Sequence, residues 1–142
     1  MLVSALSWGH HMDVTVLWSH RTALPGDPES VRQARDFICS HLLEHHLPYL
    51  VEDMRLVVSE LATNATLHAR TPFTVTLDGL LASVLLTVQD DSPSIPTTRN
   101  PSVMATGGRG LSIVDRVSRD WGVTTPGPQR PKTVWASFDL RH

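Results

Sequence analysis

The sequence predicts an α+β fold, a two-layer α/β sandwich in which helices cover one face of a mixed, mainly antiparallel sheet. Three observations support this fold class. Two long segments in the first half carry apolar residues at helical spacing, two short strand-like segments follow in the middle, and two more close the chain. The expected element order is β-α-α-β-β-loop-α-β-β.

The composition is that of one folded domain. The 142 residues are 41% hydrophobic, which is enough to form a core. The formal net charge is −2, so the chain lacks the excess of basic residues that would indicate nucleic-acid binding. Cys39 is the single cysteine, which excludes an internal disulfide, and no apolar run is long enough to span a bilayer. We therefore expect a cytoplasmic protein with a flexible leader at residues 1–12 and one domain at residues 13–142.

The first half of the chain is expected to hold one strand and two helices. The strand runs from Val14 to Trp18, and Asp27 is the predicted N-cap of the first helix, with Pro28 in its first turn. This helix should end before Pro48, and the second helix should run from about Leu50 to His68. The buried stripes are predicted to be Val31, Ala34, Ile38 and Leu42 in the first helix and Met54, Val57, Val58, Leu61 and Ala65 in the second.

The second half is expected to supply the rest of the sheet. Two antiparallel strands, Phe73 to Leu77 and Ser83 to Asp90, are joined through a turn that contains Asp78-Gly79. The stretch 91–110 is rich in Pro, Ser, Thr and Gly, as in a functional loop. A third helix (about 111–118) and two strands (121–125 and 133–140) complete the prediction.

Three short motifs contain residues suited to nucleotide chemistry. Glu60 and Asn64 lie four residues apart on one helix face, where a carboxylate and an amide can hold a hydrated Mg²⁺. Asp90 ends an apolar strand, where a carboxylate can accept a hydrogen bond from an amine such as that of adenine. Gly107-Gly108-Arg109-Gly110 leads into a helix, whose N-terminus favours phosphate. Each motif alone is also typical of a polar helix face, a turn or a flexible helix entry.

Together and in this order, the motifs resemble those of the GHKL ATPases, the superfamily of gyrase, histidine-kinase and chaperone nucleotide domains. Glu60 to Asn64 is similar to the asparagine box, Asp90 to the adenine-binding aspartate, and Gly108 to Leu111 to the second glycine box. The stretch Glu60 to Ala69 and the closing Lys132 to Ala136 most resemble the small bacterial anti-sigma-factor serine kinases. The resemblance covers about residues 25–140 and implies the GHKL fold.

The resemblance also implies a role for each matching residue. Asn64 would ligate Mg²⁺ on the phosphates of ATP, Glu60 would be the general base, and Asp90 would bind the adenine amine with support from Thr133. Arg109 and the neighbouring backbone would contact phosphates, behind a loop that acts as a lid. The implied nucleotide-binding set is Asn64, His68, Asp90, Ser92, Ile95, Gly108, Arg109, Gly110, Leu111 and Thr133.

At the level of function, the resemblance implies an ATP- and Mg²⁺-dependent protein serine/threonine kinase. Such a protein binds a sigma factor and phosphorylates an anti-sigma antagonist protein, without direct contact to nucleic acid or membrane, and it is often a homodimer. One alternative is a non-catalytic ATP-binding protein-interaction module with the same fold. A second is the detached catalytic domain of a histidine kinase, which the lack of a helical hairpin with a phospho-accepting histidine disfavours.

The chain also departs from the family pattern. Ser92 and Ser94 stand where the first glycine box usually has glycine, and Pro131 stands where the subfamily often has glycine. Serine adopts positive φ less readily than glycine, so these positions favour the non-catalytic alternative, whereas the presence of Glu60 favours the enzyme.

Other conspicuous residues are interpreted without a catalytic role. The adjacent pairs His10-His11 and His45-His46 are interpreted as surface histidines, because neighbours in sequence do not face one metal ion on a helix. The tryptophans Trp8, Trp18, Trp121 and Trp135 are interpreted as packing residues.

Overall fold

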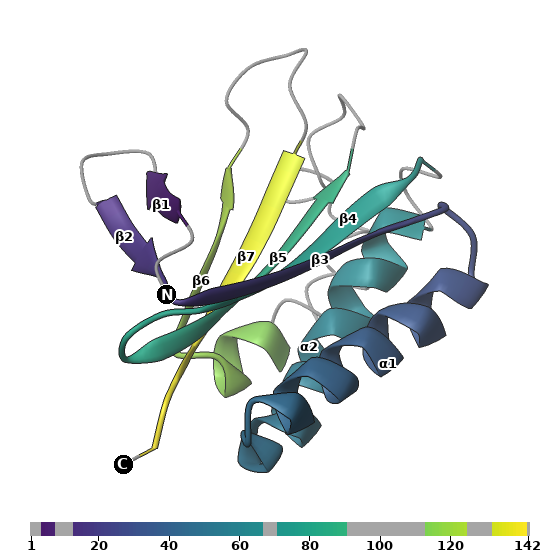
Figure 1. Ribbon diagram of the computed structural model, residues 1–142. Helices are drawn as coiled ribbons and strands as arrows, with labels where there is room; N and C mark the ends of the chain where they lie inside the picture. The colour runs from purple at the N-terminus through teal and green to yellow at the C-terminus, as the bar shows by residue number, and fades with distance from the viewer. Residues whose placement is uncertain (1–3, 8–12, 67–70, 91–112, 125–131, 142) are drawn as a thin grey trace.

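A five-stranded antiparallel sheet in the order β3-β4-β5-β7-β6 forms one layer of the computed structural model (Figure 1). Its strands are β3 (Trp18–Leu24), β4 (Phe73–Gly79), β5 (Ser83–Asp90), β6 (Asp120–Thr124) and β7 (Lys132–Asp139). A separate hairpin pairs β1 (Ser4–Ser7) with β2 (Asp13–Val16). The structure describes residues 4–7, 13–66, 71–90, 113–124 and 132–141.

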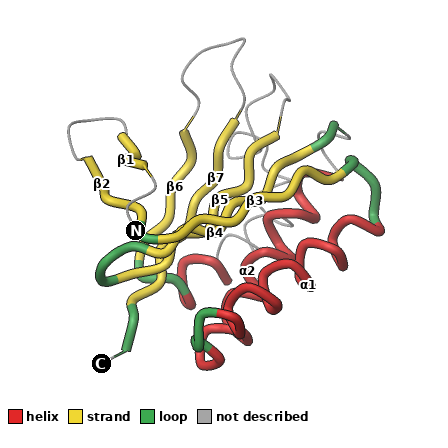
Figure 2. Tube along the Cα trace, viewed as in Figure 1, coloured by secondary structure: helices red, strands yellow, loops and turns green. Residues whose placement is uncertain are grey.

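The helices form the second layer and cover one face of this sheet (Figure 2). They are α1 (Glu29–Glu44) and α2 (Val51–Asn64), with the short 3₁₀ helix η1 (Pro48–Leu50) between them, and residues 113–117 are also helical. Every pairing between described strands of the sheet is antiparallel. The predicted α+β sandwich is therefore confirmed.

The core lies between the two layers, and the predicted stripes supply its helical side. Each residue of the two stripes is buried except Val31, which is half-buried and packs against the core. The sheet contributes Phe73, Val75, Leu77, Val84, Leu86, Val88, Ala136 and Phe138. Burying a large apolar side chain contributes about 1.5–3 kcal/mol, so this shared core is what holds the helices on the sheet.

The register of the sheet decides which polar residues face the helices. Alternate residues point to opposite faces, so Asp90 shares the helix-covered face with Val84, Leu86 and Val88. At one end of the sheet, Leu24, Phe73, Asp90 and Lys132 lie side by side on neighbouring strands. Four residues along β3 from Leu24, His20 lies opposite Leu77 and near the other end.

The N-terminal part of the sheet differs from the prediction. The single strand expected from Val14 to Trp18 is divided between β2 and β3, and Ser4–Ser7, within the expected leader, is a strand. β3 alternates exposed and half-buried residues rather than exposed and fully buried ones. Its sequence, Trp-Ser-His-Arg-Thr-Ala-Leu, therefore lacks the clear apolar alternation that identifies a strand.

The first helix begins one residue later than expected, and the prediction that Asp27 is its N-cap was wrong. Pro28 occupies the N-cap position and makes no side-chain cap. The buried Ser30 hydroxyl donates to the Pro25 carbonyl oxygen at 2.6 Å and lies 3.4 Å from Asp27 Oδ1. The side chain of Asp27 thus contacts a serine of the first turn instead of the helix backbone.

One glycine fixes the packing at the far end of β3. Gly79 lies directly opposite Trp18 in the β3–β4 register. A Cβ atom at position 79 would lie 2.0 Å from Trp18 Cε2, so the indole packs directly on the glycine backbone. Any larger side chain at this position would have to displace the ring.

Candidate functional site

Asp90 is a buried carboxylate at the end of β5, on the face of the sheet that the helices cover. Only 3% of the residue is exposed. Its Oδ2 atom lies 3.2 Å from the ammonium Nζ of Lys132, which is the first residue of β7 and Asp90's direct neighbour in the register. A buried carboxylate needs a compensating partner, and the ammonium group of Lys132 is such a partner.

Glu60 and Asn64 lie one helical turn apart in the last part of α2, and both are half-buried. After Asn64 the helix widens to a π-type turn at Ala65 and Thr66, and the Thr66 hydroxyl donates to the Thr63 carbonyl oxygen at 3.1 Å. Such side-chain bonds to the preceding turn compete with the regular helix, which accounts for the local widening. The sequence thus places an amide oxygen and a carboxylate where α2 ends.

The ends of α2 and β5 lie at the same end of the molecule (Figure 1). The chain that leaves α2 enters the sheet at Phe73, and Phe73 is the residue directly opposite Asp90. The structure thereby places two of the three predicted motifs, 26 residues apart between Asn64 and Asp90, at the same end of the molecule.

Thr133, predicted to support Asp90, has a different neighbour. It lies opposite Gln89 on β5, so its side chain is on the face of the sheet away from Asp90. The contact with Asp90 comes from Lys132 instead. The remaining predicted residues, His68, Ser92, Ile95, Gly108, Arg109, Gly110 and Leu111, lie outside the described part of the chain.

Lys132 contacts Asp90 and was not among the site residues predicted from the sequence. The inward positions of β7 are Lys132, Val134, Ala136 and Phe138, so the lysine is the one charged residue among apolar neighbours. A lysine in such a series is seldom buried without a carboxylate partner. The alternation pattern was therefore a usable signal, but the identity of the partner depended on the strand order.

The residues present suit Mg²⁺ and ATP as ligands. Mg²⁺ prefers oxygen donors and commonly reaches phosphates through only one or two protein groups, which Asn64 can supply. A carboxylate has two oxygens with about four lone-pair positions and can accept more than one hydrogen bond. A buried acceptor of this kind matches the exocyclic amine of adenine.

A comparison with known protein families agrees with this assignment. Residues 24–137 match the family model described as the histidine kinase-like ATPase domain. The chain matches none of the curated proteins. Within the described residues, the structure has no helix with the length and apolar character of a membrane span. The match covers most of the chain, so the protein belongs to the histidine kinase-like ATPases of the GHKL superfamily and is an ATP-binding domain.

Proposed function

We propose that this ATP-binding domain is an anti-sigma factor and a Mg²⁺-dependent protein serine/threonine kinase that phosphorylates an anti-sigma antagonist. The observation that carries the proposal is the pairing of a complete base-and-amide turn, Glu60 and Asn64, with the buried carboxylate Asp90 at the same end of the fold. These residues provide a proton acceptor, a metal ligand and an adenine acceptor, and the motif around Glu60 resembles that of the anti-sigma kinases.

In the proposed reaction, each residue has one simple role. When bound, Mg-ATP supplies the phosphoryl group and neutralises its charge. Asn64 would hold the metal, and Glu60, one turn earlier on α2, would accept the proton of the attacking serine or threonine hydroxyl. Asp90, which contacts Lys132, would accept a hydrogen bond from the adenine amine. Phosphoryl transfer depends mainly on such positioning and charge stabilisation.

The second candidate is a non-catalytic ATP-binding module. Ser92 and Ser94 in the glycine positions of the first glycine box favour it, because a loop altered there can retain ATP without positioning it for transfer. In this alternative, ATP shapes the surface that binds the sigma factor, and Glu60 abstracts no proton. The two candidates share Asp90 and Asn64, so only the fate of the phosphate separates them.

Nucleotide selectivity tests the shared part of both candidates. Asp90 should favour ATP over GTP, because guanine presents an acceptor oxygen where adenine presents an amine. The mismatch should cost about 1–3 kcal/mol, a preference of roughly 5- to 150-fold in Kd by calorimetry. Equal affinities for the two nucleotides would remove Asp90 from the proposed role.

Two substitutions on α2 separate binding from transfer. Asn64→Ala should abolish Mg²⁺-dependent ATP binding, because the metal loses its proposed protein ligand. Glu60→Gln should bind Mg-ATP like the parent and slow phosphorylation of the antagonist by roughly 100-fold or more. The parent should transfer phosphate from radiolabelled ATP to serine or threonine of the partner. A partner that binds tightly and stays unphosphorylated would support the non-catalytic module instead.

The partner surface is proposed to include the exposed first half of α1. Arg32 is exposed there and pairs only loosely with Glu29, at 3.6 Å, and the half-buried Arg35 follows one turn later. Arg32→Glu should weaken partner binding, with a larger effect at low salt, and leave ATP binding unchanged. Partner affinity that does not respond to this charge reversal would place the docking surface elsewhere.

A further inference from the structure

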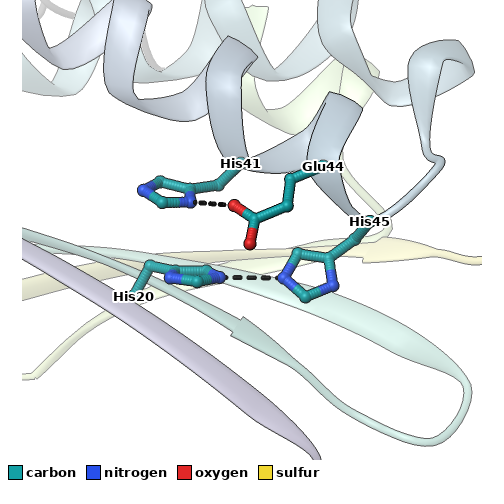
Figure 3. A network of polar contacts seen from close by, with 4 residues as sticks. All are labelled: His20, His41, Glu44 and His45. Carbon is teal, nitrogen blue, oxygen red and sulfur yellow. Dashed lines mark hydrogen bonds and ion pairs between the residues drawn. The ribbon is translucent and has the colours of Figure 1, made fainter.

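Four polar side chains meet where the end of α1 lies against β3 (Figure 3). His20 comes from β3, His41 and Glu44 come from the last turn of α1, and His45 is the C-cap of that helix. His20 is 25 residues from His45 in sequence, so only the folded chain brings these groups together. The cluster lies near the end of β3 opposite to the row that contains Asp90.

The contacts within the cluster are short. His41 Nδ1 lies 2.9 Å from Glu44 Oε1, and His20 Nε2 lies 2.8 Å from His45 Nε2. The rings of His20 and His41 stack with their centroids 3.7 Å apart. One ligand atom from each of His20, His41 and Glu44 lies within 4.8 Å of the other two. Two imidazoles and a carboxylate therefore converge on one small volume.

The hydrogen bonds of the cluster limit which of its groups can be charged together. Two ring nitrogens at 2.8 Å require one donor and one acceptor, so His20 and His45 cannot both be charged. Burial, followed by the nearby His41, lowers the pKa of His20, and burial likewise lowers the pKa of His45. The hydrogen bond from His41 lowers the pKa of Glu44.

The helix end that carries three of these residues is rigidly terminated. The His46 N–H donates to the Leu43 carbonyl oxygen at 3.0 Å, and the Leu47 N–H donates to that of Leu42 at 2.8 Å. His46 has a φ of 61°, so the pattern is a Schellman motif with a histidine in the left-handed position. Leu42 is fully buried and anchors this turn in the core. The backbone that carries His41, Glu44 and His45 is thus fixed at the end of α1.

A ring stack supports the cluster from the side of β3. Trp18 stacks on His45 with centroids 3.7 Å apart and an interplanar angle of 7°. The indole itself is fixed against Gly79 on the neighbouring strand. This contact orients the His45 ring towards His20, as Figure 3 shows for the two facing nitrogens. Residues that hold ligands in this way are typical of built metal sites.

We propose that His20, His41 and Glu44 form a binding site for Zn²⁺, with His45 or water as the fourth ligand. Zn²⁺ takes four nitrogen, oxygen or sulfur ligands at about 2.0–2.2 Å in tetrahedral geometry, which places donors roughly 3.3 Å apart. To reach that arrangement, the stacked rings of His20 and His41 would have to rotate until their lone pairs point at one position. The bound ion would cross-link the end of α1 to β3, away from the nucleotide region. It would thereby stabilise the packing of the helix on the sheet.

The test uses the full chain after removal of metals with a chelator. Calorimetric titration with ZnCl₂ should give one ion per chain, and Co²⁺ should give the intense visible absorption of four-coordinate geometry. At a hundredfold excess of Zn²⁺ over Kd, Tm should rise by roughly 5–10 °C, because the ion binds only the folded chain. A parent protein that takes up no Zn²⁺ in this titration overturns the proposal.

Two kinds of variant assign the ion to this cluster. His41→Ala and Glu44→Ala remove ligands at the helix end and should weaken Zn²⁺ binding at least 10-fold. The matched controls are His46→Asn, next to the cluster in a position that asparagine tolerates, and the double variant His10→Ala/His11→Ala. Both controls should bind like the parent. Zn²⁺ binding that survives in the first pair, or that is lost with His10 and His11, would place the ion elsewhere. Mg-ATP affinity should be the same in all four variants.

Discussion

The two ends of the sheet stabilise polar side chains between the same two layers by different means. At the Asp90 end, opposite charges on neighbouring strands meet at 3.2 Å, and the two side chains are 3% and 6% exposed. At the His20 end, half-buried rings from a strand and a helix stack and share a hydrogen bond without requiring charge. The strand register alone positions the first pair, whereas the second cluster depends on how α1 packs on β3.

This difference determines how much stability the protein loses when a residue at each end is substituted. Removing one member of a buried ion pair leaves an uncompensated charge, which is among the most costly changes in a protein. Removing one ring from a neutral stack loses packing and leaves neighbours that can reach water. The Asp90 end should therefore be the more sensitive to substitution, and the following predictions test that order.

The largest effect is expected at Lys132. Lys132→Met should lower the free energy of unfolding by about 3–5 kcal/mol, because Asp90 stays buried without the cation that balances it. The double change Lys132→Met/Asp90→Leu should recover most of this loss in urea denaturation. Arg119→Met is the control, since its 2.8 Å pair with Asp139 is exposed and should contribute below about 1 kcal/mol. A loss at Lys132 no greater than that at Arg119 would contradict the comparison.

A smaller loss is expected at the other end. In metal-free protein, His20→Ala should lower the free energy of unfolding by about 1–2 kcal/mol, through the lost stacking with His41 and the bond to His45. Because the two ends are far apart, the effects of His20→Ala and Lys132→Met should add within about 0.5 kcal/mol. Strong coupling in this double-mutant cycle would show that the ends do not act independently.

A modest increase in stability is expected from a substitution at His46. The left-handed φ of 61° is unfavourable for a residue with a Cβ atom, and glycine adopts it without that strain. His46→Gly should therefore raise the free energy of unfolding by up to about 1 kcal/mol, measured by thermal or urea denaturation. A destabilised glycine variant would mean that the His46 side chain makes a favourable contribution that outweighs the backbone strain.

The smallest expected effect is a pH dependence of stability that arises from Asp78. This residue is 4% exposed on the sheet face away from the helices, and burial raises its pKa above the usual value, against the lowering effects of Ser19, Arg21 and His20. The folded state therefore holds the proton more tightly than the unfolded chain, and stability falls as pH rises from about 4 through the folded-state pKa. Asp78→Asn should lack this fall, so its advantage over the parent should grow across that window. Parallel pH profiles for the two proteins would contradict the prediction.

The sequence predicted the helices well because their apolar stripes are long and fully buried. Met54, Val57, Val58 and Leu61 repeat at helical spacing and all lie in the core. β3 escaped prediction because its inward positions include His20 and Thr22, which carry little apolar signal, and remain only half-buried. An edge strand that is covered by one helix end does not need the clear alternation of a central strand.

The same limit applies to the functional residues. Asn64 and Asp90 were proposed as nucleotide-site residues because each lies within a recognisable local motif, and that role stays a prediction. The contact between Lys132 and Asp90 follows from the order of β5 and β7, and the convergence of His20 with His41 follows from the packing of a helix on a strand. Such tertiary relations leave no fixed spacing in the sequence, which is why the pair His45-His46 read as ordinary surface histidines.

The lack of a side chain at Gly79 affects more than its own strand, β4. Because Gly79 has no side chain, the Trp18 indole packs directly on the backbone of β4. The His45 ring stacks on this indole and so takes its orientation from it. A single methyl group added to the β4–β5 hairpin would be transmitted, through one indole, to a histidine at the end of a helix. The β4–β5 hairpin therefore influences how α1 packs on the sheet. A mutation at Gly79 would move Trp18 and, through it, the His45 ring, without touching the histidine itself.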